Sequence, residues 1–208
     1  MKRTLLIWLA AGMLTFSAAS AQEAPKDPEV FKIGAILAMS GKADWYGKVM
    51  SAGILQAVDE INAKGGIEGI KLEAVIEDHK SGVAKEGVSA ITRLINIHNV
   101  QAVLSSFSPP TLAIAPIADE KGILVLNGGG VSTAMVGASK YLFHNRSLAS
   151  DLGRAAAKRA NELGLKRLAQ LAWKSDAGES IIAAVEPYWK SKGGTITATE
   201  FMEVGAPN

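Results

Sequence analysis

Residues 100–126 have the sequence VQAVLSSFSPPTLAIAPIADEKGILVL, in which two short apolar segments enclose a longer one with helical character. Residues 100–104 and 123–126 are predominantly apolar, as strands buried on both faces of a sheet are. Residues 111–121 favour a helix, and a glycine after a basic residue, as at Lys121-Gly122, is a helix-terminating signal. The stretch therefore predicts a strand, a helix and a second strand.

The same alternation extends toward the N-terminus. Residues 31–37 are an apolar run and residues 71–77 alternate apolar with charged side chains, so both segments favour strands. Residues 47–63 and 83–97 carry apolar side chains at helical spacing. Strands that alternate with helices predict a parallel sheet with helices on both faces. The expected fold class is therefore α/β, with a doubly wound parallel sheet.

A second unit is expected after a glycine-rich break at residues 127–139. A short extended segment is expected at 141–144, before the crossing to this unit near residues 141–150. The expected elements of the second unit are a helix at 151–163, a strand at 167–173, a helix at 178–192 kinked at Pro187, and a strand at 195–201. We therefore expect lobe one at residues 30–145 and the start of lobe two at 148–208. Because so small a second unit buries little surface, we expect sequence beyond Asn208 to complete it; the alternative is a small complete domain.

Residues 1–21 have the features of a cleavable signal peptide. A basic start precedes a short apolar run, and an Ala-Ser-Ala sequence predicts cleavage after Ala21. The alternative is a membrane anchor, for which the run is short. The chain has 22 Lys and Arg against 20 Asp and Glu, and removing Lys2 and Arg3 makes the counts equal. We therefore expect a near-neutral periplasmic protein that does not bind nucleic acid.

Three loops at the expected carboxyl ends of strands are candidate ligand sites, because open α/β sheets bind ligands there. The first, residues 40–47, places Trp45 and Tyr46 beside two glycines. An aromatic ring at a cleft rim covers a ligand, whereas the alternative is that one ring packs in the core and the other covers a helix end.

The second loop, residues 105–110, contains Ser106, Phe107 and Ser108 before two prolines. Hydroxyls and backbone amides at a helix N-terminus suit a carboxylate. The structural alternative is that Ser108 caps the helix and Pro109 occupies its first position. The two roles are compatible, because a capping serine faces the mouth of the cleft.

The third loop, residues 127–133, has the sequence NGGGVST. A glycine run after a strand indicates close approach of the backbone to a ligand, and the alternative is a flexible crossover loop. The spacing matches neither the G-x-G-x-x-G dinucleotide motif nor the phosphate-binding loop with its lysine.

Catalytic and metal-binding patterns have little support. No G-x-S-x-G or H-E-x-x-H motif occurs, and the absence of cysteine excludes disulfides, zinc–thiolate clusters and thiol catalysis. Asp78 and His79 could contact a metal, but a solvated strand end is the favoured interpretation. We therefore expect neither an enzyme nor a cofactor.

Four segments, taken in order, resemble the branched-chain amino acid (leucine/isoleucine/valine) binding protein family, the soluble receptors of ABC importers. They are IGAILAMSG at 33–41, VDEINAKGGIEG at 58–69, KLEAVIEDHKS at 71–81 and APIADEKGI at 115–123. The resemblance covers residues 31–201. It implies the N-terminal portion of the type I periplasmic binding fold, in which two hinged lobes close on a ligand.

The resemblance also implies which residues of the first two loops contact the ligand. Tyr46 matches the aromatic residue of the family's cleft. Ser108, flanked by Ser106 and Phe107, matches the serine that grips the carboxylate of an amino acid. The two prolines that follow depart from the family's small polar residues, and proline supplies no backbone donor.

Further site residues are implied in the third loop and in lobe two. Backbone contacts to the ligand's ammonium group fall at Gly129, Gly130 and Val131, and Val131 replaces a hydroxyl residue often used for ligand contact. Ala177 stands where many members have a tyrosine that closes over the ligand. A free amino acid is thus one expected ligand, beside the amides and aromatic acids that related receptors take.

The function expected from these residues is a monomeric receptor that binds a small polar ligand and delivers it to an ABC transporter permease by cleft closure. The ligand is an amino acid or a related amide or carboxylate. The alternative is a periplasmic ligand sensor of the same fold that signals to a partner protein.

Overall fold

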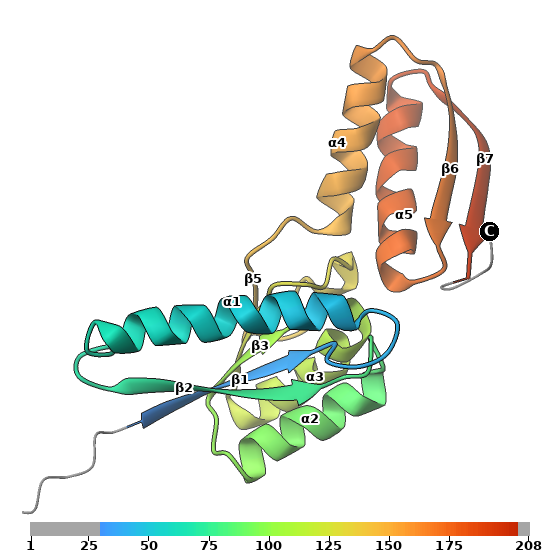
Figure 1. The fold of residues 1–208 in the computed structure, drawn as a ribbon. Helices are drawn as coiled ribbons and strands as arrows, with labels where there is room; N and C mark the ends of the chain where they lie inside the picture. The colour runs from blue at the N-terminus through green and yellow to red at the C-terminus, as the bar shows by residue number, and fades with distance from the viewer. Residues whose placement is uncertain (1–29, 204–208) are drawn as a thin grey trace, which may run out of the picture.

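The computed structural model describes residues 30–203, which form two parallel sheets with helices packed against them (Figure 1). The first sheet has five strands in the order β2-β1-β3-β4-β5 and the second pairs β6 with β7. The strands are β1 (Val30–Leu37), β2 (Lys71–Asp78), β3 (Ala102–Ser105), β4 (Leu124–Asn127), β5 (Leu142–His144), β6 (Arg167–Trp173) and β7 (Thr195–Met202). The helices are α1 (Asp44–Ala63), α2 (Ala84–Asn96), α3 (Ser108–Lys121), the short 3₁₀ helix η1 (Thr133–Met135), α4 (Ala149–Glu162) and α5 (Asp176–Ser191). The predicted signal peptide at 1–21 lies outside the described residues.

The first sheet is wound in two directions from β1, which pairs in parallel with β2 on one side and β3 on the other. Helix α1 packs on one face, and α2 and α3 pack on the opposite face (Figure 1). A hydrophobic cluster joins the sheet to α2 and α3; its fully buried members include Ile36, Ile91, Leu94, Ile114 and Val125. The predicted α/β fold with a parallel sheet and helices on both faces is confirmed.

Four helices begin earlier than the sequence pattern predicts, and the shifts of α1 and α3 concern the candidate site. Helix α1 begins at Asp44 rather than at residue 47, so Trp45 and Tyr46 lie in its first turn and not in a loop. Helix α3 begins at Ser108 rather than at residue 111. Prolines fit that first turn because its backbone N–H groups have no acceptor within the helix.

The face of the first sheet that carries α1 is only partly covered by the described residues. Apolar side chains of α1 and the neighbouring strands line an open groove of about 340 Å³ there. The lining residues are Ile33, Met50, Gly53, Ile54, Ala57, Val58, Ile61, Leu72 and Leu104. Leu124 on β4 and Phe143 on β5 are also exposed, at 45% and 53%. The main core of this unit therefore lies on the α2–α3 side.

The second sheet packs against α4 and α5 through a small cluster centred on Ala157, Val185 and Trp189. The indole N–H of Trp189 donates to the carbonyl of Thr195, which ties α5 to the start of β7. Pro187 lies within α5, which continues to Ser191. Within residues 30–203, no helix combines the length and the apolar character needed to cross a membrane.

Two glycines of α1 provide a matched test of its packing. A Cβ on Gly47 would lie 2.1 Å from the carbonyl oxygen of Ala38, whereas a Cβ on Gly53 would meet no atom within 4 Å. We predict that Gly47→Ala lowers the free energy of unfolding by about 1–3 kcal/mol, because α1 must move off the end of β1. Gly53→Ala should raise it by about 0.5–1 kcal/mol, because alanine is the better helix former. Urea denaturation measures both; destabilisation by both variants would contradict this packing.

Candidate functional site

The loops that follow β1, β2, β3 and β4 meet at the carboxyl edge of the first sheet. Contacts between residues far apart in sequence join them, such as the 5.9 Å between the ring centroids of Tyr46 and Phe107. The backbone amide of Val131 donates to Ser108 Oγ at 3.1 Å. The structure therefore brings together all three loops that the sequence singles out.

The two aromatic residues of α1 form an exposed pair at this edge. Their ring centroids lie 3.7 Å apart and the rings are stacked at 27°. Trp45 is 55% exposed and Tyr46 is 46% exposed, so neither ring packs in the core. The edge-on contact of Tyr46 with Phe107 extends the pair into a continuous aromatic surface beside the loop after β3.

Ser108 is the first residue of α3 and not its cap, because the N-cap position belongs to Phe107. Its Oγ accepts hydrogen bonds from the amides of Val131 and Ser132, at 3.1 and 3.0 Å. Among the hydrogen bonds of the described residues, none uses the Ser108 hydroxyl as a donor. A hydroxyl that accepts twice still has its proton to give, so Ser108 is equipped to donate to an anionic ligand.

Ser106, in contrast, has its hydroxyl engaged on both sides. The side chain is 1% exposed. Its Oγ lies 2.9 Å from His79 Nε2 and donates to the carbonyl of Ile36 at 3.2 Å. The hydroxyl of Ser108 is therefore available to donate to a ligand, whereas that of Ser106 is not. The sequence alone does not separate the two serines.

The glycine-rich loop after β4 is held by Asn127. Its Oδ1 accepts from the amides of Gly129 and Gly130, at 3.3 and 2.7 Å, and its amide nitrogen donates to the carbonyl of Gly130. A Cβ on Gly129 would lie 2.7 Å from Cβ of Ser106, so this glycine allows close packing of two loops. The sequence predicts that the backbone of this loop approaches a ligand closely. At Gly129, the close approach is instead to another loop of the protein.

The carbonyls in this loop also have partners. Gly129 accepts from Arg146 at 3.1 Å, and Val131 accepts from the amide of Ala149. A carbonyl oxygen has two lone pairs, so an ammonium group can still be accepted. Gly129, Gly130 and Val131 remain predicted ligand contacts.

Two polar residues at the end of β2 are more important than the sequence indicates. Oδ1 of Asp78 accepts from the amides of Met39 and Lys80, at 2.9 and 2.7 Å, and its carboxylate also accepts from the amide and hydroxyl of Ser40. Partial burial raises the pKa of the Asp78 carboxyl, but these hydrogen bonds, that of the Ser40 hydroxyl foremost, outweigh it and lower the pKa below the ordinary value.

The predicted solvated strand end is wrong for His79, whose side chain is fully buried. Desolvation lowers the pKa of its imidazole, so the ring is neutral at pH 7. Its sequence neighbours are charged, and no local pattern signals this burial. Within residues 30–203, no three His, Cys, Asp or Glu side chains are grouped closely enough to hold a metal ion.

The two units contact each other through α5 and the loop that contains η1. Ser180 Oγ accepts from the amide of Thr133 at 3.2 Å and donates to the carbonyl of Asp176 at 2.6 Å. Ala177, the predicted contact from lobe two, is half-buried in the first turn of α5. Ser180, which no sequence pattern singles out, therefore hydrogen-bonds to the first unit, as does the amide of Ala149, which donates to the carbonyl of Val131.

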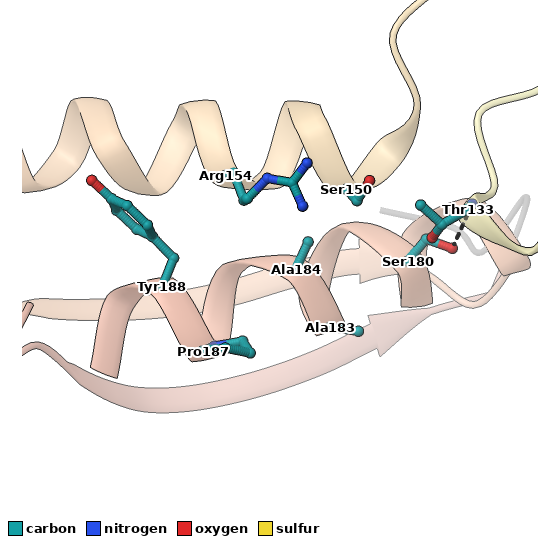
Figure 2. Close-up of a pocket in the computed structure, with 8 residues that line it drawn as sticks. All are labelled: Thr133, Ser150, Arg154, Ser180, Ala183, Ala184, Pro187 and Tyr188. Atoms are coloured by element: carbon teal, nitrogen blue, oxygen red, sulfur yellow. Dashed lines mark hydrogen bonds between the residues drawn. The ribbon is translucent and has the colours of Figure 1, made fainter. Parts of the chain in front are cut away.

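An open groove of about 380 Å³ lies beside this contact, between η1, α4 and α5 (Figure 2). It is lined by Thr133, Ser150, Arg154, Ser180, Ala183, Ala184, Pro187 and Tyr188. Arg154 extends from α4 over α5 in Figure 2 and pairs with Asp151. The groove is separate from the aromatic pair of α1.

Comparison with known proteins finds relatives whose descriptions agree with one another. A family model described as periplasmic binding protein matches residues 30–208. The Leu/Ile/Val/Thr-binding protein of Salmonella typhimurium is 32% identical over 176 residues, 84% of this chain and 48% of the relative. The Leu/Ile/Val-binding protein of Escherichia coli is 28% identical over 179 residues, 85% of this chain and 48% of the relative. The chain spans about half the length of the curated relatives it matches.

Solved structures give the same result for the fold. The branched-chain amino acid substrate-binding protein LivJ of Streptococcus pneumoniae, in complex with isoleucine, matches with a TM-score of 0.78 and 29% identity, over 86% of this chain and 51% of that one. A solute-binding protein of an R. palustris ABC transporter, in complex with 4-hydroxybenzoate, has a TM-score of 0.80 at 22% identity, over 86% of this chain and 49% of that one. The latter likeness concerns the fold alone.

The Asp78 carboxylate yields a prediction about acid stability. Because its pKa is lowered in the folded chain, its stabilisation is present above the ordinary carboxyl pKa and is lost as the pH falls through the folded value. Asp78→Asn should lower the free energy of unfolding at pH 7 by about 1.5–3 kcal/mol, and the difference from wild type should shrink toward about pH 3. Urea denaturation across this pH range is the measurement.

The exposed Asp59 of α1 supplies the control. Asp59→Asn should leave the free energy of unfolding within about 0.5 kcal/mol of wild type at every pH. A difference between Asp78→Asn and wild type that stays constant with pH would show that the charge of Asp78 contributes nothing.

Proposed function

The chain belongs to the periplasmic binding protein family, and on that premise we propose that it carries the ligand-gripping lobe of a receptor for a small carboxylate, such as an amino acid or an aromatic acid. The resemblance seen in the sequence is thereby confirmed at the level of the family. The observation that carries the proposal is the Ser108 hydroxyl, whose proton is available beside an exposed aromatic surface.

A carboxylate fits this position for two electrostatic reasons. Ser108 opens α3, a helix of 14 residues, and the N-terminal end of a helix carries partial positive charge. The next two residues are prolines and supply no N–H group. The hydroxyl of Ser108 is therefore a donor that this helix end still offers, beside the backbone N–H groups of Phe107 and Ser108.

The aromatic surface suits the other end of such a ligand. Trp45, Tyr46 and Phe107 present stacked and edge-on rings within one continuous contact. Aliphatic and aromatic groups both gain from burial against such rings. This agrees with relatives named for leucine, isoleucine and valine, and with a structural neighbour solved with 4-hydroxybenzoate.

The proposed mechanism is closure of the second unit over the ligand. A ligand that contacts both units favours the closed arrangement by its differential affinity for that state, and no chemical step is required. The hydrogen bond of Ser180 with Thr133 lies at the boundary between the two units that such a movement would rearrange. We further propose a periplasmic location, a monomeric state and delivery to an ABC transporter permease, as the family description and the neighbours' names support.

Ligand titration followed by ¹H–¹⁵N NMR tests this proposal. The panel holds branched-chain amino acids, benzoate, hydroxybenzoates and uncharged amides, with glucose as the negative control. We expect one carboxylate class to shift the amides of the loops after β1, β3 and β4. Absence of binding across the panel, or binding of glucose alone, would contradict the proposal.

Replacing Ser108 tests the assigned donor. Ser108→Ala should weaken the best carboxylate by about 10-fold to 100-fold, because a hydrogen bond to a charged acceptor is lost. Ser89→Ala is the matched control, since Ser89 lies on α2 and its hydroxyl donates to the carbonyl of Lys85. Wild-type affinity in Ser108→Ala would show that the carboxylate is held elsewhere.

A further inference from the structure

His79 is a buried ionisable residue in contact with the candidate site, and the proposed mechanism does not use it. It follows β2 directly, and its side chain has no exposed surface. A polar ring placed there has to be fully hydrogen-bonded, because an unpaired buried polar group costs about 1–3 kcal/mol. The hydrogen-bond partners of the imidazole therefore indicate its role.

The partners define a single tautomer. The amide of Gly82 donates to Nδ1 at 3.0 Å, so Nδ1 carries no proton. In a neutral ring the proton is then on Nε2, which donates to Ser106 Oγ at 2.9 Å. The Ser106 hydroxyl in turn donates a hydrogen bond to the carbonyl of Ile36. The chain of hydrogen bonds thus runs from the end of β2 to the loop after β3 and on to β1.

The ring also supports Phe107. The two ring centroids lie 5.1 Å apart with the planes inclined at 62°. Phe107 has a positive φ of 63°, a conformation that costs a residue with a side chain about 1–3 kcal/mol and has to be held by its surroundings. Gly82 packs under the same ring, since a Cβ there would lie 3.3 Å from Phe107 Cδ1. His79 and Gly82 therefore hold the residue that precedes Ser108.

We propose that His79 is a positioning residue of the ligand site, which acts through Ser106 and Phe107 to fix the direction of the Ser108 hydroxyl. Few contacts connect Ser106 to the Ser108 hydroxyl. Ser106 packs against Gly129, and the loop that contains Gly129 supplies the amides of Val131 and Ser132 to Ser108. The inference rests on the proposed function for its effect on binding.

Two amide substitutions separate the two hydrogen bonds of the ring. In His79→Gln the side-chain amide reaches the place of Nε2 and can donate to Ser106, whereas in His79→Asn it reaches only the place of Nδ1 and can accept from Gly82. Each variant keeps one of the two bonds, so both should lose similar free energy of unfolding. Only His79→Asn releases Ser106.

The readouts are the ¹H–¹⁵N resonances of Val131 and Ser132 and the affinity for the best carboxylate. We expect His79→Gln to leave these resonances in place and to change affinity by less than about 3-fold. His79→Asn should shift both resonances and weaken binding by about 10-fold. The positioning role would be overturned if the two variants changed the resonances and the affinity equally. It would also be overturned if the loss of affinity were proportional to the loss of free energy of unfolding.

One measurement needs neither a variant nor a ligand. The imidazole ¹⁵N spectrum of the wild-type chain should show a neutral ring protonated at Nε2, and a ring protonated at Nδ1 would overturn the assignment. If no carboxylate binds, the proposed function fails, while the tautomer and the Val131 and Ser132 resonances still decide whether His79 controls the Ser108 hydroxyl.

Discussion

The strand order β2-β1-β3-β4-β5 is the constraint on which the candidate site depends. Because the chain winds in opposite directions on the two sides of β1, α1 covers one face of the sheet and α2 and α3 cover the other (Figure 1). The loops after β1 and β3 consequently diverge at the carboxyl edge, and the space between them is where open α/β sheets bind ligands. Tyr46 lies in the first turn of α1 and Ser108 begins α3, and these two helices leave the edge on opposite faces of the sheet.

Where two loops diverge, their polar groups need hydrogen-bond partners. Residues at the end of β2 supply these partners. The carboxylate of Asp78 gathers donors from the loop after β1, and His79 reaches Ser106 in the loop after β3. The end of β2 thus holds the loops after β1 and β3 in place. Such a role explains why two polar side chains at a strand end are buried or hydrogen-bonded rather than solvated.

Sequence periodicity predicts most of the elements, since β6 has the predicted bounds and the predicted order of strands and helices from β1 to β4 is present. It misplaces the start of α1 because no side chain caps that helix and Asp44 carries no apolar signal. It also misjudges His79, whose burial comes from Ser106 and Phe107, 27 and 28 positions later in the chain. The difference between Ser106 and Ser108 depends on hydrogen-bond direction, which a sequence of neighbouring serines does not encode.

The two units differ in the size of their hydrophobic cores, and this difference bears on the proposal that the first unit holds the ligand's carboxylate. The core of the first unit includes buried side chains from α2, α3 and four strands, whereas the core of the second is centred on Ala157, Val185 and Trp189. A hydroxyl that must meet a carboxylate in one direction needs a rigid support, because a donor that is free to rotate loses conformational entropy when it binds. The first unit supplies that support to Ser108 through buried hydrogen bonds, and the second unit contacts the first through Ser180 and through the amide of Ala149. This difference agrees with the proposal that the first unit recognises the carboxylate and the second unit moves.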